Sequence, residues 1–393
     1  MAIKSLTALA IRVPLRRTIR HASHARTETD NLLVRCELTD GTVGWGEGVP
    51  RSYVTGETID SALAALRGCD WSAWSVWPGP DWAAAVQRLD DFQLPTPPDD
   101  ARRIRANSAR CAMELALLDA AGRQLGQPLS SVTGLIAPGL LLPQERVQYS
   151  GAITSSQGVK AYFAALGMRL YGFAHLKIKV GIAGQDDVAR LRLIRRASGA
   201  RLVLRLDANE AWQPDNVAAR IAALLPFEIA SVEQPVPHAQ IGCLPAVRRQ
   251  LGVRIMHDES LCGQVDAERA VADGTCDLFN LRLSKCGGFL PTLHLAAFAR
   301  EHGLGCQLGC QVGETGILSA AGRHFATSVA GLLWREGSYD RRLLAANVLV
   351  RDITFGAGGW APALTEPGLG VTIDEQAVDH LTQHREPLWP PAA

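Results

Sequence analysis

Charged residues recur at regular intervals in the middle of the chain, each time after a short apolar run. They lie in the segments Lys177-Ile178-Lys179, Asp207-Ala208-Asn209, Glu233-Gln234-Pro235, Asp258-Glu259-Ser260 and Lys285-Cys286-Gly287-Gly288. From Lys179 to Lys285 they are spaced by 25 to 28 residues, about the length of one strand, one helix and two loops. Each charged residue therefore occupies the same place in its repeat, and we expect all of them at one end of a (β/α)8 barrel.

Three carboxylates, those of Asp207, Glu233 and Asp258, end consecutive strands of this predicted barrel. Carboxylates brought together repel one another unless a cation lies among them. Hard oxygen ligands of this number suit Mg²⁺, which keeps other positions for water or substrate oxygens. The alternative is that each carboxylate caps the helix that follows it. Their equivalent positions at three consecutive strand ends favour a metal site.

Three lysines could carry proton transfer. Lys177 and Lys179 are two residues apart on a predicted strand, so they point to the same side, and a lysine inside a barrel is costly unless it is paired or functional. Lys285 ends the sixth strand, across the barrel mouth from the second. A divalent cation and a dry site lower a lysine pKa from ~10.4 toward ~7–8, where the amine can act as a base. Two such lysines could serve opposite faces of a carbon acid, with Glu259 orienting Lys285 and Arg205 bracing the carboxylates.

The elements that must position these residues follow from the apolar pattern. Eight segments of strand character alternate with helical segments, which fits a closed parallel barrel better than an open sheet. Strands are predicted at 147–152, 175–180, 201–207, 228–233, 253–258, 278–283, 304–310 and 332–336, and helices at 185–197, 215–225, 290–302 and 317–329. No GxGxxG follows the first strand, which argues against a dinucleotide-binding fold.

The residues before the barrel predict a smaller α+β domain, in which the turn signal Asp40-Gly41 joins two strands. Strands are expected at 3–15, 31–38 and 42–47, and helices at 59–66, 82–89 and 101–125. We therefore predict an α+β capping domain at residues 1–140 and a catalytic (β/α) barrel at 141–342. The tail at 343–393 has no place in the barrel and is expected to return to the capping domain.

Composition narrows the class of protein. The 393 residues are 47% hydrophobic and 20% charged, with a net charge of +1, which is typical of a soluble globular protein. This balance gives no sign of nucleic-acid or membrane binding. Nine scattered cysteines without a CxxC pair indicate neither a disulfide framework nor a zinc site. Because no signal peptide or membrane span is evident, we expect a cytoplasmic protein.

The segments KxK, DAN, EQP, DES and KCGG together resemble the enolase superfamily, specifically the muconate-lactonizing-enzyme subgroup of the mandelate racemase and muconate lactonizing enzyme family. The resemblance extends to GWGE in the N-terminal hairpin and to VTGET at 54–58. It implies a modified TIM barrel with a capping domain, and an isomerase that acts on a small-molecule carboxylate. We also expect a homo-oligomer.

The resemblance also assigns roles. Asp207, Glu233 and Asp258 would bind Mg²⁺, with Mn²⁺ as an alternative, and Asn209 would support them. Lys179 and Lys285 would be the acid/base pair, with Lys177 assisting Lys179. Enolase-superfamily sites in general use a lysine or histidine base with Mg²⁺ stabilising an enediolate, so this mechanism is carried over from the family.

Two loops of the capping domain, around 21–25 and 51–55, would close over the substrate according to the same resemblance. The expected substrate-binding residues are His21, His24, Arg51 and Tyr53 on these loops, and Gln311, Glu314 and Glu336 at the seventh and eighth strands. Arg51 could bind a second anionic group of the substrate.

The eighth strand bears on the choice of substrate. Relatives that act on dipeptides resemble one another in an Asp-x-Asp there, which holds the substrate ammonium, whereas this chain has Trp334-Arg335-Glu336-Gly337-Ser338. One carboxylate lies beside a competing arginine and an apolar tryptophan. We therefore predict cycloisomerisation, racemisation or epimerisation of a carboxylate without a free amine. A dehydratase that performs β-elimination on a hydroxy acid, and a non-catalytic carboxylate-binding barrel, stay open as alternatives.

Overall fold

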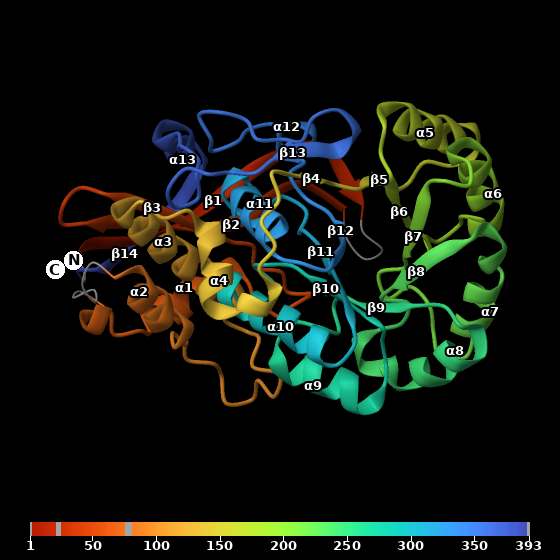
Figure 1. Cartoon of the computed structure of the whole chain (residues 1–393), viewed down its shortest axis with the longest axis horizontal. Coiled ribbons are helices and arrows are strands. Elements are labelled where there is room, and N and C mark those ends of the chain that lie inside the picture. Colours follow the sequence, from red (N-terminus) through yellow and green to blue (C-terminus); the bar gives the residue numbers. More distant parts are fainter. Residues whose placement is uncertain (1, 21–24, 75–80, 391–393) are drawn as a thin grey trace.

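The structure is a computed structural model that describes residues 2–20, 25–74 and 81–390. An N-terminal sheet with its helices lies on one side of the molecule and a ring of strands and helices lies on the other (Figure 1). Within the described residues, no helix is both long and apolar enough to cross a membrane.

The ring is a parallel sheet of eight strands in the order β12-β11-β10-β9-β8-β7-β6-β5. The strands are β5 (Gly151–Ile153), β6 (His175–Lys179), β7 (Val203–Asp207), β8 (Ile229–Glu233), β9 (Ile255–His257), β10 (Leu278–Leu281), β11 (Gly305–Leu308) and β12 (Leu332–Arg335). The backbone N–H of Ser150, just before β5, donates to the carbonyl of Arg335 at 2.8 Å. This bond joins the two outer strands, and the predicted barrel-type fold is confirmed.

Helices follow the strands as the pattern predicts. They are α5 (Gly158–Tyr171), α6 (Asp187–Ser198), α7 (Val217–Ala222), α8 (Leu244–Leu251), α9 (Gln264–Asp273), α10 (Phe289–Glu301), α11 (Gly316–Ser328) and α12 (Asp340–Leu343). The helix predicted at 215–225 is shorter in the structure, and the 3₁₀ turn η4 (Leu225–Phe227) follows it. Pro226 lies in that turn, and a proline cannot continue the hydrogen-bond ladder of an α-helix.

The first predicted barrel strand, 147–152, is wrong as one element. The chain forms β4 (Arg146–Gln148), which pairs with β13 (Trp360–Pro362) in an antiparallel ladder, and only then enters β5. Part of the tail therefore lies against the entrance of the barrel. The proposed domain boundaries at 140 and 343 stay predictions.

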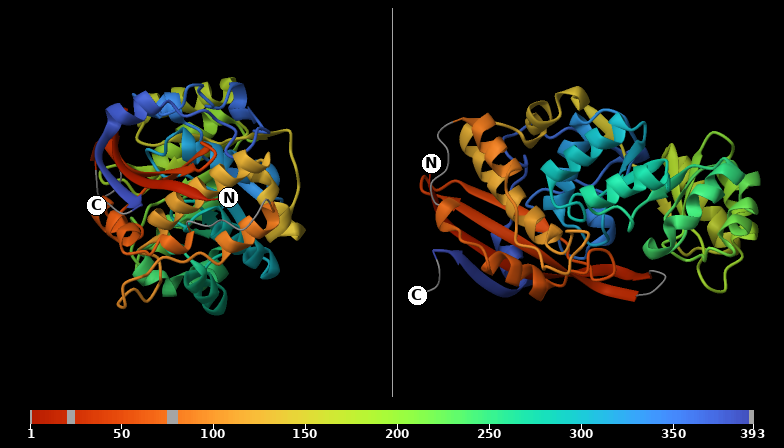
Figure 2. Two further views of the ribbon diagram at one scale, coloured as in Figure 1. Left: turned by 90° about the vertical axis from the view of Figure 1, so that its left-hand side faces the viewer. Right: turned by 90° about the horizontal axis from the view of Figure 1, so that it is seen from below.

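The N-terminal domain contains an antiparallel sheet in the order β14-β1-β2-β3. Its strands are β1 (Ile3–Arg20), β2 (Ala25–Leu38), β3 (Val43–Gly48) and the C-terminal β14 (Thr382–Trp389), and its helices are α1 (Ile59–Arg67), α2 (Trp82–Asp90) and α3 (Asn107–Leu125). The tail thus completes this sheet, as predicted. β1 and β2 are longer than predicted, and they reach as a hairpin toward the barrel (Figure 2).

Close packing of β3 on α3 explains the glycines of the GWGE segment. A Cβ atom on Gly44, Gly46 or Gly48 would lie only 1.9 to 2.2 Å from backbone atoms of α3. Residues two apart on a strand face the same side, so the three glycines let the helix backbone approach this face. Glu47 then points to the other side, toward the barrel.

Two buried carboxylates of the N-terminal domain fix the helices that follow the sixth and seventh barrel strands. Glu47 accepts hydrogen bonds from the backbone N–H groups of Thr315 and Leu318, at 2.9 and 3.0 Å, around the first turn of α11. Glu114 of α3 accepts one from Leu290 in the first turn of α10, at 3.1 Å. Negative charge at a helix N-terminus is favourable, so these contacts hold the capping domain against the seventh-strand loop.

Candidate active site

The strand register places the predicted functional residues side by side. Lys179 of β6 pairs with Asp207 of β7, and Asp207 pairs with Glu233 of β8. Asp258 follows β9 directly. The three carboxylates are at most 1% exposed, so they lie in a medium where unbalanced charge is costly.

Lys177 forms the central ion pairs of the site. Its Nζ lies 2.6 Å from Oε2 of Glu336, 3.4 Å from Asp207 and 3.5 Å from Glu233. Burial lowers the pKa of this amine, but the charges of Glu233, Glu336 and Asp207 outweigh burial and hold the pKa well above its ordinary value. Lys177 therefore stays protonated and supplies positive charge at the base of the site.

Lys179 is held differently, although it lies on the same strand face. Its Nζ donates to Oδ1 of Asn209 at 2.6 Å, and both residues line the cavity described below. Asn209 has a φ of 43°, in the left-handed region that Asn tolerates better than most residues. The DAN segment thus contributes one carboxylate and one amide that positions a lysine.

Gln234 of the EQP segment fixes the loop that carries the third carboxylate. Its Oε1 accepts hydrogen bonds from the N–H groups of Asp258 and Ser260 at 3.0 and 3.1 Å, and its Nε2 donates to Ser260 Oγ at 2.7 Å. The sequence reasoning gave this fully buried side chain no role.

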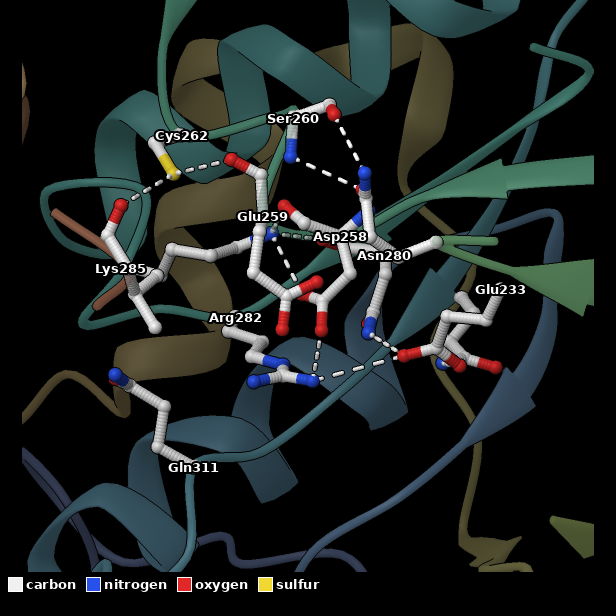
Figure 3. Close-up of polar contacts among 12 residues, drawn as sticks. Glu233, Asp258, Glu259, Ser260, Cys262, Asn280, Arg282, Lys285 and Gln311 are labelled. Carbon is white, nitrogen blue, oxygen red and sulfur yellow. Dashed lines mark hydrogen bonds and ion pairs between the residues drawn. The ribbon is translucent and has the colours of Figure 1, made fainter. Parts of the chain in front are cut away.

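Arg282 is a site residue that the sequence reasoning missed. Its guanidinium forms an ion pair with Asp258 and lies 3.6 Å from Oε1 of Glu233, bridging the two carboxylates (Figure 3). Asn280, two residues earlier, donates to the same Glu233 oxygen at 2.7 Å. The period-two alternation that singled out Lys177 and Lys179 applies equally to Asn280 and Arg282, and it could have identified both.

Lys285 is fully buried and bound to the loop of the third carboxylate. Its Nζ donates to the carbonyl and Oδ1 of Asp258 at 2.7 and 3.0 Å, and to the Asn280 carbonyl at 2.8 Å (Figure 3). Burial lowers its pKa, but Asp258 raises the pKa above its ordinary value. The three hydrogen bonds of this amine thus go to Asp258 and Asn280, in place of the predicted bond to Glu259.

Glu336 is the carboxylate that Arg205 braces. Arg205 Nη1 lies 3.0 Å from Glu336 Oε1 and also bonds Gln307, so the expectation that it braces the three predicted metal ligands is corrected. Trp334 shares the inner face of β12 with Glu336 but lies deeper, where it packs with Met256 and Leu278.

The environment of the eighth strand therefore differs from the predicted one. Trp334 does not wall the cavity, and Arg335 lies on the opposite face of β12 from Glu336. The cations that compete for Glu336 are Lys177 and Arg205. A second carboxylate, that of Asp340 at the start of α12, lines the same cavity.

A cavity of about 560 Å³ opens at the carboxyl ends of the strands. Its polar lining includes Arg17, Arg26, Tyr53, Lys177, Lys179, Asp207, Asn209, Arg282, Gln311, Glu314, Ser319, Glu336 and Asp340, and its apolar lining includes Met168, Tyr171, Phe173, Leu343 and Phe355. A lining with both polar and apolar side chains suits a small molecule that carries a charged group and an uncharged body. Glu233, Asp258 and Lys285 lie behind this lining, next to Arg282.

Of the substrate-binding residues predicted on the two loops, Tyr53 lines the cavity and Arg51 does not. Tyr53 lines the cavity beneath the guanidinium of Arg26, which is 5.1 Å from the ring centroid. Arg51 is 3% exposed and donates to the carbonyls of Asp30, Pro50 and Val312 at 3.0, 2.7 and 3.1 Å. His21 and His24 lie outside the described residues.

Arg51 thus links the N-terminal domain to the loop after β11, and its predicted contact with substrate stays a prediction. Burial lowers the pKa of its guanidinium to about 10.

The loop after the seventh strand holds two more predicted substrate-binding residues, Gln311 and Glu314. The N–H of Gln311 donates to Glu314 at 2.6 Å, and the Gln311 amide donates to the carbonyl of Val49 in the N-terminal domain at 3.2 Å.

The donor set suits a divalent cation. Burial raises the pKa of Glu233 to about 8, and the neighbouring charges of Asp207, Glu336 and Asp258 add to the rise against the opposing effect of Lys177. A cation among these oxygens would relieve that repulsion, and carboxylate oxygens are ligands that Mg²⁺ prefers. In the described part of the chain, no three Asp, Glu, His or Cys side chains are gathered as a ready metal cage, since Arg282 and Lys177 bind these carboxylates.

Comparisons with known proteins agree with this geometry. The Enolase C-terminal domain-like family matches residues 161–377. A hydrophobic dipeptide epimerase of Enterococcus faecalis is 31% identical over 337 residues, which cover 84% of this chain and 88% of that protein. The structure of an N-succinyl Arg/Lys racemase from Bacillus cereus superposes with a TM-score of 0.83 at 26% identity, covering 98% of this chain and 99% of that one.

A second structure adds a bound metal. It is a dipeptide epimerase from Enterococcus faecalis in complex with Mg and the dipeptide L-Leu-L-Tyr, with a TM-score of 0.80 and 28% identity over 95% of this chain and 100% of that chain. The chain therefore belongs to the enolase superfamily, in its mandelate racemase and muconate lactonizing enzyme branch, and is an isomerase of that superfamily.

Proposed function

We propose that the protein inverts the α-carbon of a carboxylate whose α-nitrogen is acylated, as in an N-acyl amino acid or the C-terminal residue of a dipeptide. The observation that carries this proposal is the placement of two lysines around three carboxylates. Lys179 ends β6 and Lys285 follows β10, and the strands between them hold Asp207, Glu233 and Asp258. In an eight-stranded ring, strands four apart lie on opposite sides, so two amines can reach opposite faces of one substrate.

The proton balance follows from this placement. In one direction Lys179, as the neutral amine, takes the α-proton, and protonated Lys285 delivers a proton to the other face of the carbon. In the reverse direction the two lysines exchange roles, so no external oxidant or reductant is needed. The step requires Lys285 Nζ to exchange its contact with Asp258 Oδ1 for the substrate.

We also propose Mg²⁺ as the cofactor, with Mn²⁺ as an alternative, held by Asp207, Glu233 and Asp258. When bound, the ion would supply Lewis-acid stabilisation of the negative charge that develops on the substrate carboxylate. Lys177 adds fixed positive charge beside the same oxygens, at 3.4 and 3.5 Å from Asp207 and Glu233.

The named relatives support the substrate class, because a dipeptide and an N-succinyl amino acid share an amide on the α-nitrogen. The narrower prediction of a substrate without a free amine is not supported, because Trp334 does not line the cavity and relatives of the chain act on dipeptides. A homo-oligomeric state and a cytoplasmic location stay predictions.

The test is solvent exchange by the Mg²⁺-loaded protein in D₂O. Both enantiomers of several N-acyl amino acids, and dipeptides with either configuration at the C-terminal residue, are followed by NMR and chiral chromatography. We expect loss of the α-proton signal with inversion at that carbon. Ring closure or loss of water without inversion would replace the proposal with a cycloisomerase or a dehydratase. No exchange in any member of a broad carboxylate panel would refute it.

A further inference from the structure

We infer that Arg190 and Asn107 are positioning residues for the two proposed bases, each holding the backbone carbonyl of one lysine. Arg190 lies on α6 and holds Lys179, whereas Asn107 begins α3 of the N-terminal domain and holds Lys285. In the described part of the chain, neither side chain lines the cavity, so neither is placed to touch a substrate. This inference rests on the proposed function, in which the two lysines serve opposite faces of one carbon.

Both lysines lie where the regular strand geometry ends. Lys179 is the last residue of β6, and Lys285 lies in the loop that follows β10. A lysine amine is joined to the backbone by a flexible stem of four carbons, so the position of its Nζ depends on where the backbone is held. A misplacement of about 1 Å can cost about 100-fold in rate. A side chain that fixes the carbonyl of the lysine therefore bears directly on the proton transfer.

Arg190 joins the carboxyl ends of the first and second barrel strands. The residue is 3% exposed, and its guanidinium donates to the carbonyl of Lys179. It also donates to the carbonyls of Ser156 at 2.7 Å, Thr154 at 3.0 Å and Ile153 at 3.3 Å. Because a guanidinium presents its donors in a rigid planar fork, this one group sets the end of β6 relative to the end of β5.

Asp187 fixes the backbone on the far side of the same lysine. Its Oδ2 accepts a hydrogen bond from the N–H of Gly181, two residues after Lys179, at 2.7 Å. Asp187 and Arg190 both lie in the first turn of α6, and residues three apart on a helix are neighbours on its surface. The start of α6 therefore holds the chain both at Lys179 and just beyond it.

Asn107 holds the second lysine in a comparable way. The residue is 9% exposed, and its Nδ2 donates to the carbonyl of Lys285 at 2.6 Å and to that of Cys262 at 2.7 Å. Cys262 lies in the loop after β9, which also carries Asp258. One amide of the N-terminal domain thus joins the loop of the third carboxylate to the loop of the second lysine.

The first glycine of the KCGG segment gives this amide room. Gly287 has a φ of 91°, in the left-handed region that favours glycine. A Cβ atom there would lie 3.2 Å from Oδ1 of Asn107. The carbonyl of Gly287 also accepts a hydrogen bond from Arg110 of α3 at 2.6 Å. The segment that carries Lys285 is therefore bound to α3 at two places.

The experiment follows α-proton loss in D₂O from each enantiomer of the fastest-exchanging N-acyl amino acid, with the Mg²⁺-loaded protein. Lys179→Ala and Lys285→Ala identify the enantiomer that each lysine deprotonates. Arg190→Gln should lower kcat for exchange of the Lys179 enantiomer by about 10- to 100-fold and change the other by no more than about 3-fold. Asn107→Ala should show the opposite preference. KM should change by no more than about 3-fold in both, because neither side chain binds substrate.

Arg195→Gln is the matched control. Arg195 lies on the same helix and also donates to backbone carbonyls, among them Phe227 at 3.0 Å and Leu202 at 2.8 Å, which precede β8 and β7 at the end of the barrel away from the lysines. This variant should melt at a lower temperature but treat both enantiomers alike. Arg190→Lys and Asn107→Ser each keep one donor group, so they should show the same preferences more weakly, and they keep the test valid if the first variants do not fold.

The outcomes that contradict the inference are distinct from those that contradict the proposed function. If Arg190→Gln lowers exchange of both enantiomers equally, as a general loss of stability would, the residue acts through the fold and the inference is overturned. Unchanged exchange in a folded Arg190→Gln or Asn107→Ala, or loss of the same enantiomer in both, also overturns it. In each case the proposed function stands, because the wild type still exchanges. Absence of exchange by the wild type with every α-amido carboxylate would overturn the proposed function itself.

Discussion

The Nζ atom of Lys177 lies 2.6 Å from Oε2 of Glu336, and this ion pair joins the second strand of the barrel to the end of the eighth, with the first strand between them in the ring. Both side chains are almost fully buried, and Arg205 shares the same carboxylate at 3.0 Å. The contact keeps Lys177 charged and directed toward Asp207 and Glu233. Lys179, the other lysine of the KxK pair, donates to Asn209 instead and is the proposed base.

Glu336→Gln should therefore disturb the site through Lys177. The change removes the negative charge that Lys177 and Arg205 share, and breaking a buried ion pair in this way destabilises a protein by about 3–5 kcal/mol. We expect a lower melting temperature and a fall in kcat larger than any rise in KM. Glu268→Gln, on the exposed face of α9, is the matched control and should change neither. Wild-type kcat in the Glu336 variant would mean that this ion pair does not position the catalytic lysines.

Metal binding should be visible in stability as well as in activity. If Asp207, Glu233 and Asp258 hold Mg²⁺, the ion stabilises the folded state by mass action, by about 2.7 kcal/mol at 100 times its dissociation constant. EDTA should abolish turnover, and added Mg²⁺ should restore it and raise the melting temperature. Asp207→Asn should lose most of that thermal shift. Full turnover by a rigorously metal-free sample would exclude the proposed cofactor.

Replacing Arg51 tests whether its side chain stabilises the fold or binds the substrate. Because its guanidinium links the N-terminal domain to Val312 beside the seventh strand, Arg51→Ala should lower the free energy of unfolding by about 2–4 kcal/mol, as the loss of several buried hydrogen bonds does. Arg16→Ala, an exposed change on β1, should have little effect. A raised KM with an unchanged melting temperature would instead support the predicted contact with a second anionic group of the substrate.

Glu47 should make stability depend on pH between about 4.5 and 7. Burial raises its pKa to about 7, against the hydrogen bonds from Thr315 and Leu318. The folded protein therefore binds more protons than the unfolded chain in this window, and stability falls as the pH rises. A shift of this size corresponds to about 3 kcal/mol.

The measurement for Glu47 is the difference in unfolding free energy between wild type and Glu47→Gln at several pH values. Gln does not ionise, so the variant should gain relative to the wild type as the pH rises from about 5 to about 7. Glu268→Gln, whose side chain is exposed, should show no such trend. A constant difference across this window would mean that Glu47 titrates near its ordinary value.

The repeat of strand, helix and charged residue could be predicted from sequence because it is local. Spacing alone located Asp207, Glu233 and Asp258 at neighbouring strand ends, and alternation alone placed Lys177 and Lys179 on one side. These features depend only on the periods of strands and helices. The GWGE segment could be recognised, but its reason, the approach of the α3 backbone to β3, required the packed structure.

The predictions that were wrong concern contacts between residues far apart in the sequence. Trp334 was expected beside the substrate, but the sequence does not give its depth in the barrel, where it packs against Met256. The partners of Arg205 and Lys285 depend on which strands lie opposite each other. The first barrel strand was misjudged because β13, more than two hundred residues later, pairs with its first half. Asp340 also lines the cavity, but it lies at the start of α12, beyond the strand end where the repeat places the charged residues.

In the proposed reaction, Lys179 and Lys285 serve opposite faces of one carbon. The deciding measurement is α-proton exchange in D₂O by Mg²⁺-loaded Lys179→Ala and Lys285→Ala, with each enantiomer of the best substrate offered separately. We predict that neither variant completes inversion, and that each retains exchange with one enantiomer only, the two variants retaining opposite ones. Equal residual exchange of both enantiomers in Lys179→Ala would contradict the arrangement.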